Sequence, residues 1–324
     1  MKHIKLGKRS YLFISLMIAV LLLTACGKAT GSNATSKELR IGYQKNGTTL
    51  MLKQKKQLEK DLEESGYKVT WSEFNTGSSI LEALNAGSID IAGAGDIPSI
   101  FALSKGSEFK YIASEPSSPN TEGILVSKDS SIKSLKDLKG KKVAFNKASI
   151  AQYLLNQALE SVGLTMDDIE QVHLNPPDAS IAFEQGQVDA WVVWDPYMTV
   201  SESKGNIILQ DAEGIVPYRS FYFSSSKLAE KNPEIVEKIV QHIADTGNGI
   251  NENPTEAATL LEKETNIPHA TWEKVLGRKK SDVHFMDQQA VNDLQAEADD
   301  LLKLKLIDQE VKIAEHVWDP DKKK

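Results

Sequence analysis

An internal repeat of about a hundred residues constrains the fold more than any other feature of the sequence. An apolar run that ends in an aromatic residue, an amide and a lysine occurs at 39–45 and again at 142–147, and each copy leads into a stretch of helical periodicity. Further along, Gly-Ser-Ile-Asp90 and Gly-Gln-Val-Asp189 lie 99 residues apart. A repeat of this length holds several strands and buries a core by itself, unlike the short repeats of a solenoid. The sequence therefore predicts two similar lobes.

Short apolar runs alternate with longer helical stretches in both copies, which predicts an α/β fold with two mainly parallel sheets. Helices are expected behind the first strand of each copy, and four more after residue 232. Turn-rich segments before residues 123 and 220 indicate that the chain crosses twice between the lobes, which favours a hinge and a central cleft. The expected lobe 1 comprises 39–120 and 222–324, and lobe 2 comprises 121–221. The expected helices are 48–65, 150–162, 233–250, 254–264, 268–276 and 287–304.

The N-terminus has the pattern of an export signal. Four cations precede 16 uncharged residues, Ser10–Ala25, which is shorter than the roughly 20 residues needed to cross a bilayer. This predicts a signal peptide over 1–25. It ends in Leu-Thr-Ala-Cys26, which resembles the bacterial lipobox and implies a diacylated cysteine; a small buried thiol is the alternative. Residues 26–38 are small and polar, as in a flexible tether. Two acyl chains would hold the protein on the outer face of the cell membrane.

Composition excludes several classes of function. The 38 Lys+Arg and 45 Asp+Glu residues give a net charge of -7, which speaks against a nucleic-acid partner. Loss of the four signal cations would leave 34 against 45, or -11, so an anion must be captured by local groups. One cysteine and six scattered histidines offer no disulfide and no metal-ligand spacing, and no nucleophile elbow or phosphate loop is present. We therefore expect no enzyme, cofactor or metal. An acid–base pair of Asp96 and Asp195 is the enzyme alternative.

The polar loops that follow the expected strands are rich in neutral donors. Ligands of open α/β sheets bind outside the carboxyl ends of the strands, where small and amide residues let helix N-termini hold an anion. Plain helix capping is the alternative for each single residue. The candidate residues of these loops are Gln44, Asn46, Gly47, Thr48, Asn75, Thr76, Gly77, Ser78, Ser79, Gly95, Asn146 and Ser149.

The segment Trp191–Tyr197 is the second candidate region. Strand alternation sends Trp191 and Trp194 to opposite faces, so at least one tryptophan should pack under a helix. Trp194 and Tyr197 either form an aromatic wall for the ligand or belong to the core. Asp195 either accepts a hydrogen bond from a ligand amine or caps the helix after it. Arg219, near the second crossing, is either an exposed hinge residue or a partner of the ligand's charge.

These residues give the sequence a family resemblance. It resembles the substrate-binding lipoproteins of ABC importers for aliphatic sulfonates, relatives of the taurine- and nitrate-binding proteins, over nearly all of the chain after the tether. The resemblance implies a monomer with a type II periplasmic-binding-protein fold, which passes alkanesulfonate to a membrane permease driven by a separate ATPase. Taurine, nitrate or a pyrimidine precursor of thiamine are alternative cargoes. The segments that carry the resemblance are 40–48, 81–90, 95–98, 135–144, 146–149, 186–197 and 221–223.

The resemblance also implies a set of ligand contacts. Two positions depart from the family pattern: Ala148 stands where such proteins usually have glycine, and Ala94 where they often have threonine. These departures leave the donors to the sulfonate open. The implied contacts are Gln44, Gly47, Thr48, Gly77, Ser78, Gly95, Asp96, Ser149, Trp194 and Asp195.

Overall fold

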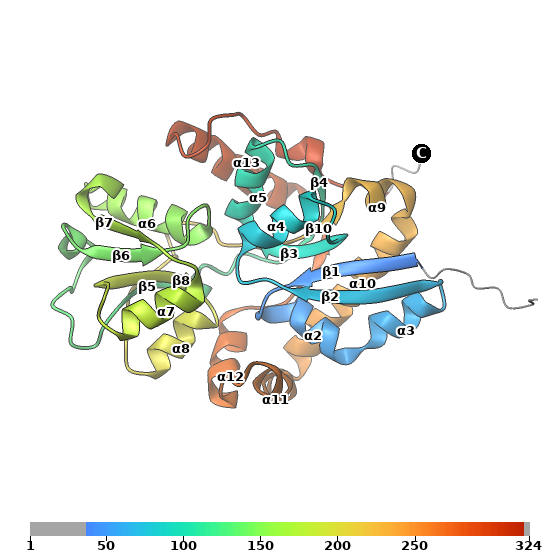
Figure 1. Cartoon of the computed structure of the whole chain (residues 1–324), viewed down its shortest axis with the longest axis horizontal. Helices are drawn as coiled ribbons and strands as arrows, with labels where there is room; N and C mark the ends of the chain where they lie inside the picture. The colour runs from blue at the N-terminus through green and yellow to red at the C-terminus, as the bar shows by residue number, and fades with distance from the viewer. Residues whose placement is uncertain (1–36, 321–324) are drawn as a thin grey trace, which may run out of the picture. The chain divides into compact units, whose positions relative to one another are not determined.

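A computed structural model describes residues 37–320 of the chain (Figure 1). The predicted signal peptide, Cys26 and nearly all of the predicted tether lie outside the described residues. Within the described part, none of the helices combines the length and the apolar character that a bilayer span requires.

Two mixed sheets form the framework of the described part (Figure 1). Their strand orders match position by position: β4, β10, β3, β1, β2 in the first and β9, β5, β8, β6, β7 in the second, with β11 added to the edge of the first. The first sheet contains β1 (Lys37–Tyr43), β2 (Tyr67–Glu73), β3 (Ile91–Gly95), β4 (Phe109–Ser114), β10 (Ser220–Ser225) and β11 (His284–Phe285). The second contains β5 (Glu122–Val126), β6 (Lys142–Phe145), β7 (Glu170–His173), β8 (Ala190–Trp194) and β9 (Ile207–Asp211).

The repeated aspartate makes the same hydrogen bond in each sheet. Asp90 Oδ2 accepts from the backbone N–H of Arg40 at 2.9 Å, and Asp189 Oδ2 accepts from that of Lys142 at 2.8 Å. Both bonds join a strand, the middle of β1 or the first residue of β6, to the residue before its parallel neighbour, β3 or β8. The two-lobed α/β fold predicted from the repeat is therefore confirmed. The lobe limits at 120 and 222 stay a prediction.

The sheets are mainly parallel, as predicted, since the pairs β1–β3, β6–β7 and β6–β8 are parallel, and one interior strand in each is reversed. β10 runs antiparallel to β3 and β4, and β5 runs antiparallel to β8 and β9. Each of these two strands is the first that the chain forms after it leaves the other sheet.

The helices of the two sheets are α2 to α5 in the first copy and α6 to α8 in the second. The single helix expected over 48–65 is wrong, because Lys56 adopts a left-handed conformation with φ 56° and separates two shorter helices. No glycine marks this break. The bounds are α2 (Gly47–Lys55), α3 (Gln57–Glu63), α4 (Gly77–Asn85), α5 (Asp96–Ser104), α6 (Ile150–Ser161), α7 (Pro176–Glu184) and α8 (Tyr197–Ser203), with short 3₁₀ turns at Pro119–Thr121, Leu135–Leu138, Met166–Asp168 and Ile313–His316.

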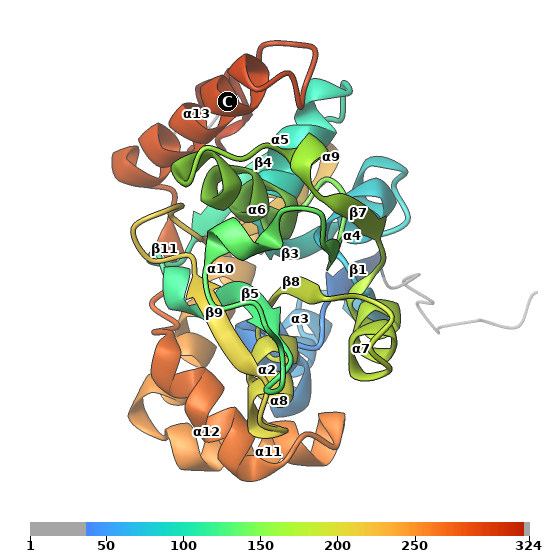
Figure 2. The ribbon, with the colours of Figure 1, turned by 90° about the vertical axis from the view of Figure 1, so that its left-hand side faces the viewer.

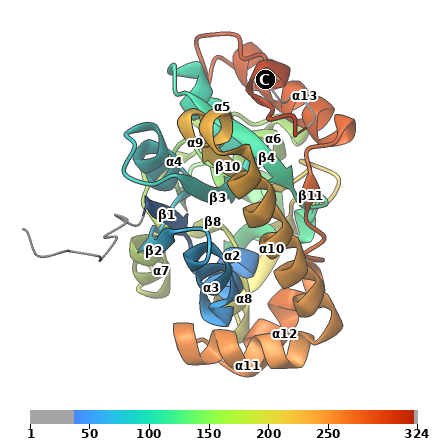
Figure 3. The same cartoon turned by 90° about the vertical axis from the view of Figure 1, so that its right-hand side faces the viewer.

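The C-terminal region is helical, as predicted. Helix α10 buries a stripe at helical spacing that includes Ile235, Ile239 and Ile243, and it packs beside α2 and α3 (Figure 3). Helix α12 packs against α11 and also contacts α8 of the second sheet (Figure 2). The C-terminal region therefore touches both sheets. The bounds are α9 (Ser226–Lys231), α10 (Pro233–Glu252), α11 (Pro254–Thr265), α12 (His269–Arg278) and α13 (Gln288–Lys303).

Candidate ligand-binding pocket

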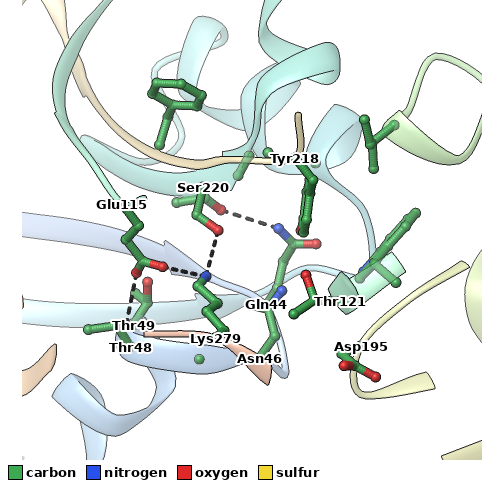
Figure 4. Close-up of a pocket in the computed structure, with 18 of the residues that line it drawn as sticks. Gln44, Asn46, Thr48, Thr49, Glu115, Thr121, Asp195, Tyr218, Ser220 and Lys279 are labelled. Atoms are coloured by element: carbon green, nitrogen blue, oxygen red, sulfur yellow. Dashed lines mark hydrogen bonds and ion pairs between the residues drawn. The ribbon is translucent and has the colours of Figure 1, made fainter. Parts of the chain in front are cut away.

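A cavity of about 80 Å³ is lined by residues of both sheets and of the C-terminal region (Figure 4). It lies at the carboxyl ends of β1, β3 and β8, where the polar loops were expected to meet. Nine of the seventeen ligand-binding residues predicted from the sequence line it: Gln44, Asn46, Gly47, Thr48, Gly77, Gly95, Ser149, Trp194 and Asp195.

Three helices begin at this cavity without a side-chain cap on the N-cap residue: α5 after Gly95, and two others after polar residues. Asn46 precedes α2 and Ser149 precedes α6, and neither side chain accepts a hydrogen bond from its own helix. The Ser149 hydroxyl instead donates to the carbonyl of Asn146 at 2.6 Å. The alternative of plain capping is wrong for these two residues. The positive ends of two helix dipoles, from equivalent places in the two copies, thus meet one cavity.

Asp195 is the cap of the helix that follows it. Its Oδ1 accepts from the backbone N–H of Thr199 at 3.0 Å and from the Thr199 hydroxyl at 2.7 Å. Its Oδ2 lies 3.4 Å from Nη1 of Arg278. Burial raises the pKa of Asp195 above its ordinary value, and the contacts with Thr199 and Arg278 offset only part of this rise. The carboxylate therefore has partners on both oxygens, although it lines the cavity.

The two tryptophans of β8 have different surroundings. Trp191 is buried and packs on Phe183 of α7, with ring centroids 5.9 Å apart. Trp194 lines the cavity on the opposite face of the strand. Tyr197 does not line this cavity; it packs edge-on against Trp191 and lines a smaller neighbouring pocket.

Seven other predicted residues also lie outside the cavity, among them Asn75, Thr76 and Ser79. The Ser78 hydroxyl donates to the carbonyl of Ala148 at 3.1 Å and so joins α4 to the loop before α6. Asn146 donates to the carbonyl of Lys147. Asp96 is 1% exposed, and its two oxygens accept from the backbone N–H groups of Ile97 and Arg219. The last of the seven is Arg219 itself.

Arg219 is not the exposed residue that one of its two alternatives predicts, and it does not line the cavity. Its guanidinium is 12% exposed and pairs with Asp293 of α13, with Nη2 2.8 Å from Oδ2. Its Nη1 donates to the carbonyl of Glu115 at 3.1 Å. The guanidinium of Arg219 therefore holds α13 against the segments that connect the two sheets, and the residue is not an exposed hinge.

The cavity contains a cation that the sequence did not indicate. Lys279, the residue after α12, forms an ion pair with Glu115 and donates to the hydroxyl of Ser220 at 2.8 Å (Figure 4). Glu115 is 1% exposed, and its Oε1 accepts from the hydroxyls of Thr48 at 3.0 Å and Tyr222 at 2.5 Å. The basic run at 278–280 resembles an ordinary solvated helix end, so nothing in the sequence distinguished Lys279.

The remaining wall of the cavity is largely apolar. It includes Val275 and Leu276 of α12, Phe221 of β10, and Ala94 and Pro98 on either side of the α5 start. An apolar wall with a few fixed polar groups is the usual composition of a small-molecule site. Within residues 37–320, no three His, Cys, Asp or Glu side chains are placed to hold a metal ion. The arrangement suits a small amphiphilic anion.

Comparison with known proteins identifies the family. The family model described as NMT1/THI5 like matches residues 62–257, more than half of the 324 residues. The chain belongs to the NMT1/THI5-like family. Two relatives also align with the chain over more than nine tenths of its length.

These two relatives are named as aliphatic sulfonates-binding proteins. The protein from Escherichia coli (strain K12) is 36% identical over 92% of this chain and 94% of its own length. The protein from Bacillus subtilis (strain 168) is 32% identical over 94% and 93%. Among solved structures, the alkanesulfonate-binding protein from Xanthomonas axonopodis pv. citri bound to MOPS matches with a TM-score of 0.82 and 36% identity, over 87% of this chain and 98% of that chain.

Proposed function

We propose that this protein is the substrate-binding subunit of an ABC importer for aliphatic sulfonates. The observation that carries the proposal is the pair of uncapped helix starts, at Asn46 and Ser149, that face one cavity. Backbone N–H groups and helix dipoles stabilise a compact anion there. The near full-length similarity to proteins named for aliphatic sulfonate binding supports the same conclusion.

The size and lining of the cavity support a short organosulfonate. A volume of about 80 Å³ is several times the roughly 10 to 15 Å³ that a single water molecule requires, so the cavity has room for a small organic ion. A sulfonate group would face the helix starts and Thr48, while a short alkyl chain would lie against Val275 and Leu276. The implied contacts that line the cavity, Gln44, Gly47, Thr48, Gly77, Gly95, Ser149, Trp194 and Asp195, are proposed as the binding residues.

The delivery role implies further partners. We propose that the loaded protein, a monomer, passes its cargo to a membrane permease with a separate ATPase, and that diacylated Cys26 holds it on the outer face of the cell membrane. Cys26→Ser tests the anchor: the wild-type protein should sediment with membranes and incorporate labelled palmitate, while the variant should do neither. Equal labelling of both proteins would contradict it.

Catalysis by Asp96 and Asp195 has little support. Asp96 is buried outside the cavity, and both oxygens of Asp195 already have partners. General acid–base catalysis needs a carboxyl that reaches the substrate. We therefore propose a binding role without chemistry.

Titration calorimetry on the full chain, refolded to remove any bound compound, tests the proposal. Methanesulfonate to hexanesulfonate should bind one to one, with a Kd of about 1 μM for the best chain length. Alcohols of the same chain lengths are the matched controls and should give no heat, because they lack the anionic group. Heat from taurine, nitrate or a hydroxymethylpyrimidine, with none from any alkanesulfonate, would assign a different cargo.

A further inference from the structure

Two carboxylates line the cavity, and consecutive residues at the end of α12 neutralise them. Arg278 pairs with Asp195, and Lys279 pairs with Glu115. An anionic ligand would otherwise meet two negative groups in a site of low dielectric. The charge balance that lets this cavity accept an anion therefore depends on the two consecutive cations.

The two cations differ in whether they line the cavity and in how many of their N–H donors have partners. Arg278 does not line the cavity, and its guanidinium also donates to Thr199 and to Glu202 at 2.6 Å. Lys279 lines the cavity, with a side chain that is 19% exposed. An ammonium group has three N–H donors. Within the described residues, two of them have partners, Glu115 and Ser220.

The surroundings of Lys279 suit an anionic headgroup. Thr48 of α2 shares Glu115 with Lys279, so the ammonium lies beside the uncapped start of that helix (Figure 4). A headgroup here would meet the ammonium and the positive end of the helix dipole together. Val275 and Leu276, one turn before Lys279 on the same helix, also line the cavity and could face the alkyl chain.

We infer that Lys279 binds the anionic headgroup of the ligand and that Glu115 and Ser220 hold its ammonium in position for this contact. The inference rests on the proposed function and adds a specificity-determining residue to it. The role requires the charge of Lys279 itself, since a neutral donor of similar reach would not discriminate an anion from a neutral analogue.

The competing role is neutralisation of Glu115 alone. In that case Lys279→Gln would weaken binding only because it leaves a buried, unpaired carboxylate at the cavity. Glu115→Gln combined with Lys279→Gln removes both charges and separates the two roles. The double variant also protects against misfolding, because it leaves neither buried charge without its partner.

The experiment is calorimetric titration of the best-binding alkanesulfonate into the full chain and four variants. Lys279→Gln and the double variant should both bind about 10- to 100-fold more weakly than wild type, as expected for a lost charge-assisted hydrogen bond. Glu115→Gln keeps the cation but removes one of the groups that position it, so its loss of affinity should be smaller than that of Lys279→Gln. Lys280→Gln, the same change at the exposed next residue, is the matched control and should bind like wild type.

Each other outcome contradicts either the inference on Lys279 or the proposed function. Wild-type affinity in the double variant would reduce Lys279 to a neutraliser of Glu115 and overturn the inference, as would wild-type affinity in Lys279→Gln. Equal losses in Lys280→Gln and Lys279→Gln would also overturn it, since they would indicate a general field effect. Failure of wild type to bind any sulfonate would instead overturn the proposed function, on which the inference rests.

Discussion

The Nη1 atom of Arg278 lies 3.4 Å from Oδ2 of Asp195, and this pair ties the C-terminal helix α12 to the start of α8 on the second sheet. Both side chains are largely buried, at 15% and 5% exposure. Arg278 also pairs with Glu202 of α8, which Lys274 reaches from one turn earlier on α12. The contact of α12 with the second sheet is thus an ionic cluster. Its least exposed side chains are Arg278 on α12 and Asp195 before α8.

Arg278→Met is expected to lower the free energy of unfolding by about 3 kcal/mol, because it leaves Asp195 as a buried charge without its cation. Lys274→Met is the matched control: its ammonium is 51% exposed, so its loss should cost at most about 1 kcal/mol. Urea denaturation at pH 7.5 measures both. Equal losses would contradict a special role for the Arg278–Asp195 pair.

Ala148 is held in the left-handed region, with φ 53°. This conformation penalises a residue with a Cβ, so Ala148→Gly should raise the free energy of unfolding by about 1 kcal/mol. The same change at Ala296, an exposed position inside α13, should lower it by about 1 kcal/mol, because glycine disfavours a helix interior. Thermal unfolding of both variants gives the comparison. Losses of stability in both would show that Ala148 is not strained.

Glu122 is fully buried at the start of β5, and among the described residues neither of its carboxylate oxygens has a hydrogen-bond partner. Burial raises its pKa, and the nearby Asp96 raises it further. Burial likewise raises the pKa of Asp96, from 3.8 to about 7. A folded state that binds more protons than the unfolded state loses stability as pH rises. These two carboxyls should therefore make the protein less stable at pH 7 than at pH 5.

Glu122→Gln mimics the protonated carboxyl and removes its part of this dependence. The variant should be more stable than wild type at pH 8, by about 1 to 3 kcal/mol, and close to wild type at pH 5. Urea midpoints across this pH range measure the difference. A wild-type stability that rises steadily from pH 5 to pH 8, with a parallel curve for the variant, would contradict burial of a protonated Glu122.

Trp194 lines the cavity, whereas Trp318 packs on Phe285 of the first sheet. A bound ligand should change the fluorescence of Trp194 by altering its solvent contact. The change at saturation should persist in Trp318→Phe and largely disappear in Trp194→Phe, with calorimetry confirming that the latter variant still binds. An undiminished signal from a saturated Trp194→Phe would place the ligand elsewhere.

The repeat made the framework predictable, because Asp90 and Asp189 recur for a structural reason: each joins two parallel strands through the same hydrogen bond. The loops after those strands were predictable for the same reason, which brought Gln44, Ser149 and Trp194 to one cavity. Which interior strand of each sheet is reversed was not predictable, since no local pattern distinguishes β5 or β10 from the parallel strands.

Local sequence patterns did not predict the charged part of the site. Lys279 directly follows one of the C-terminal helices, which have no counterpart in the repeat, and its partner Glu115 follows β4, far away in the sequence. The burial of Arg219 was not predicted because its ion-pair partner, Asp293, lies 74 residues further on. Such pairings depend on tertiary packing, so residue type and spacing alone do not indicate which cation faces a ligand.

Native mass spectrometry in a defined mixture tests the central claim most directly. Ligand-free protein would be incubated with equal concentrations of ethanesulfonate, taurine, nitrate and a hydroxymethylpyrimidine, and the retained mass would then be read from the complex. We predict one bound ethanesulfonate per chain. An excess of a second sulfonate of different mass should displace it. Retention of the pyrimidine or nitrate, or no bound mass from this mixture, would contradict a receptor for aliphatic sulfonates.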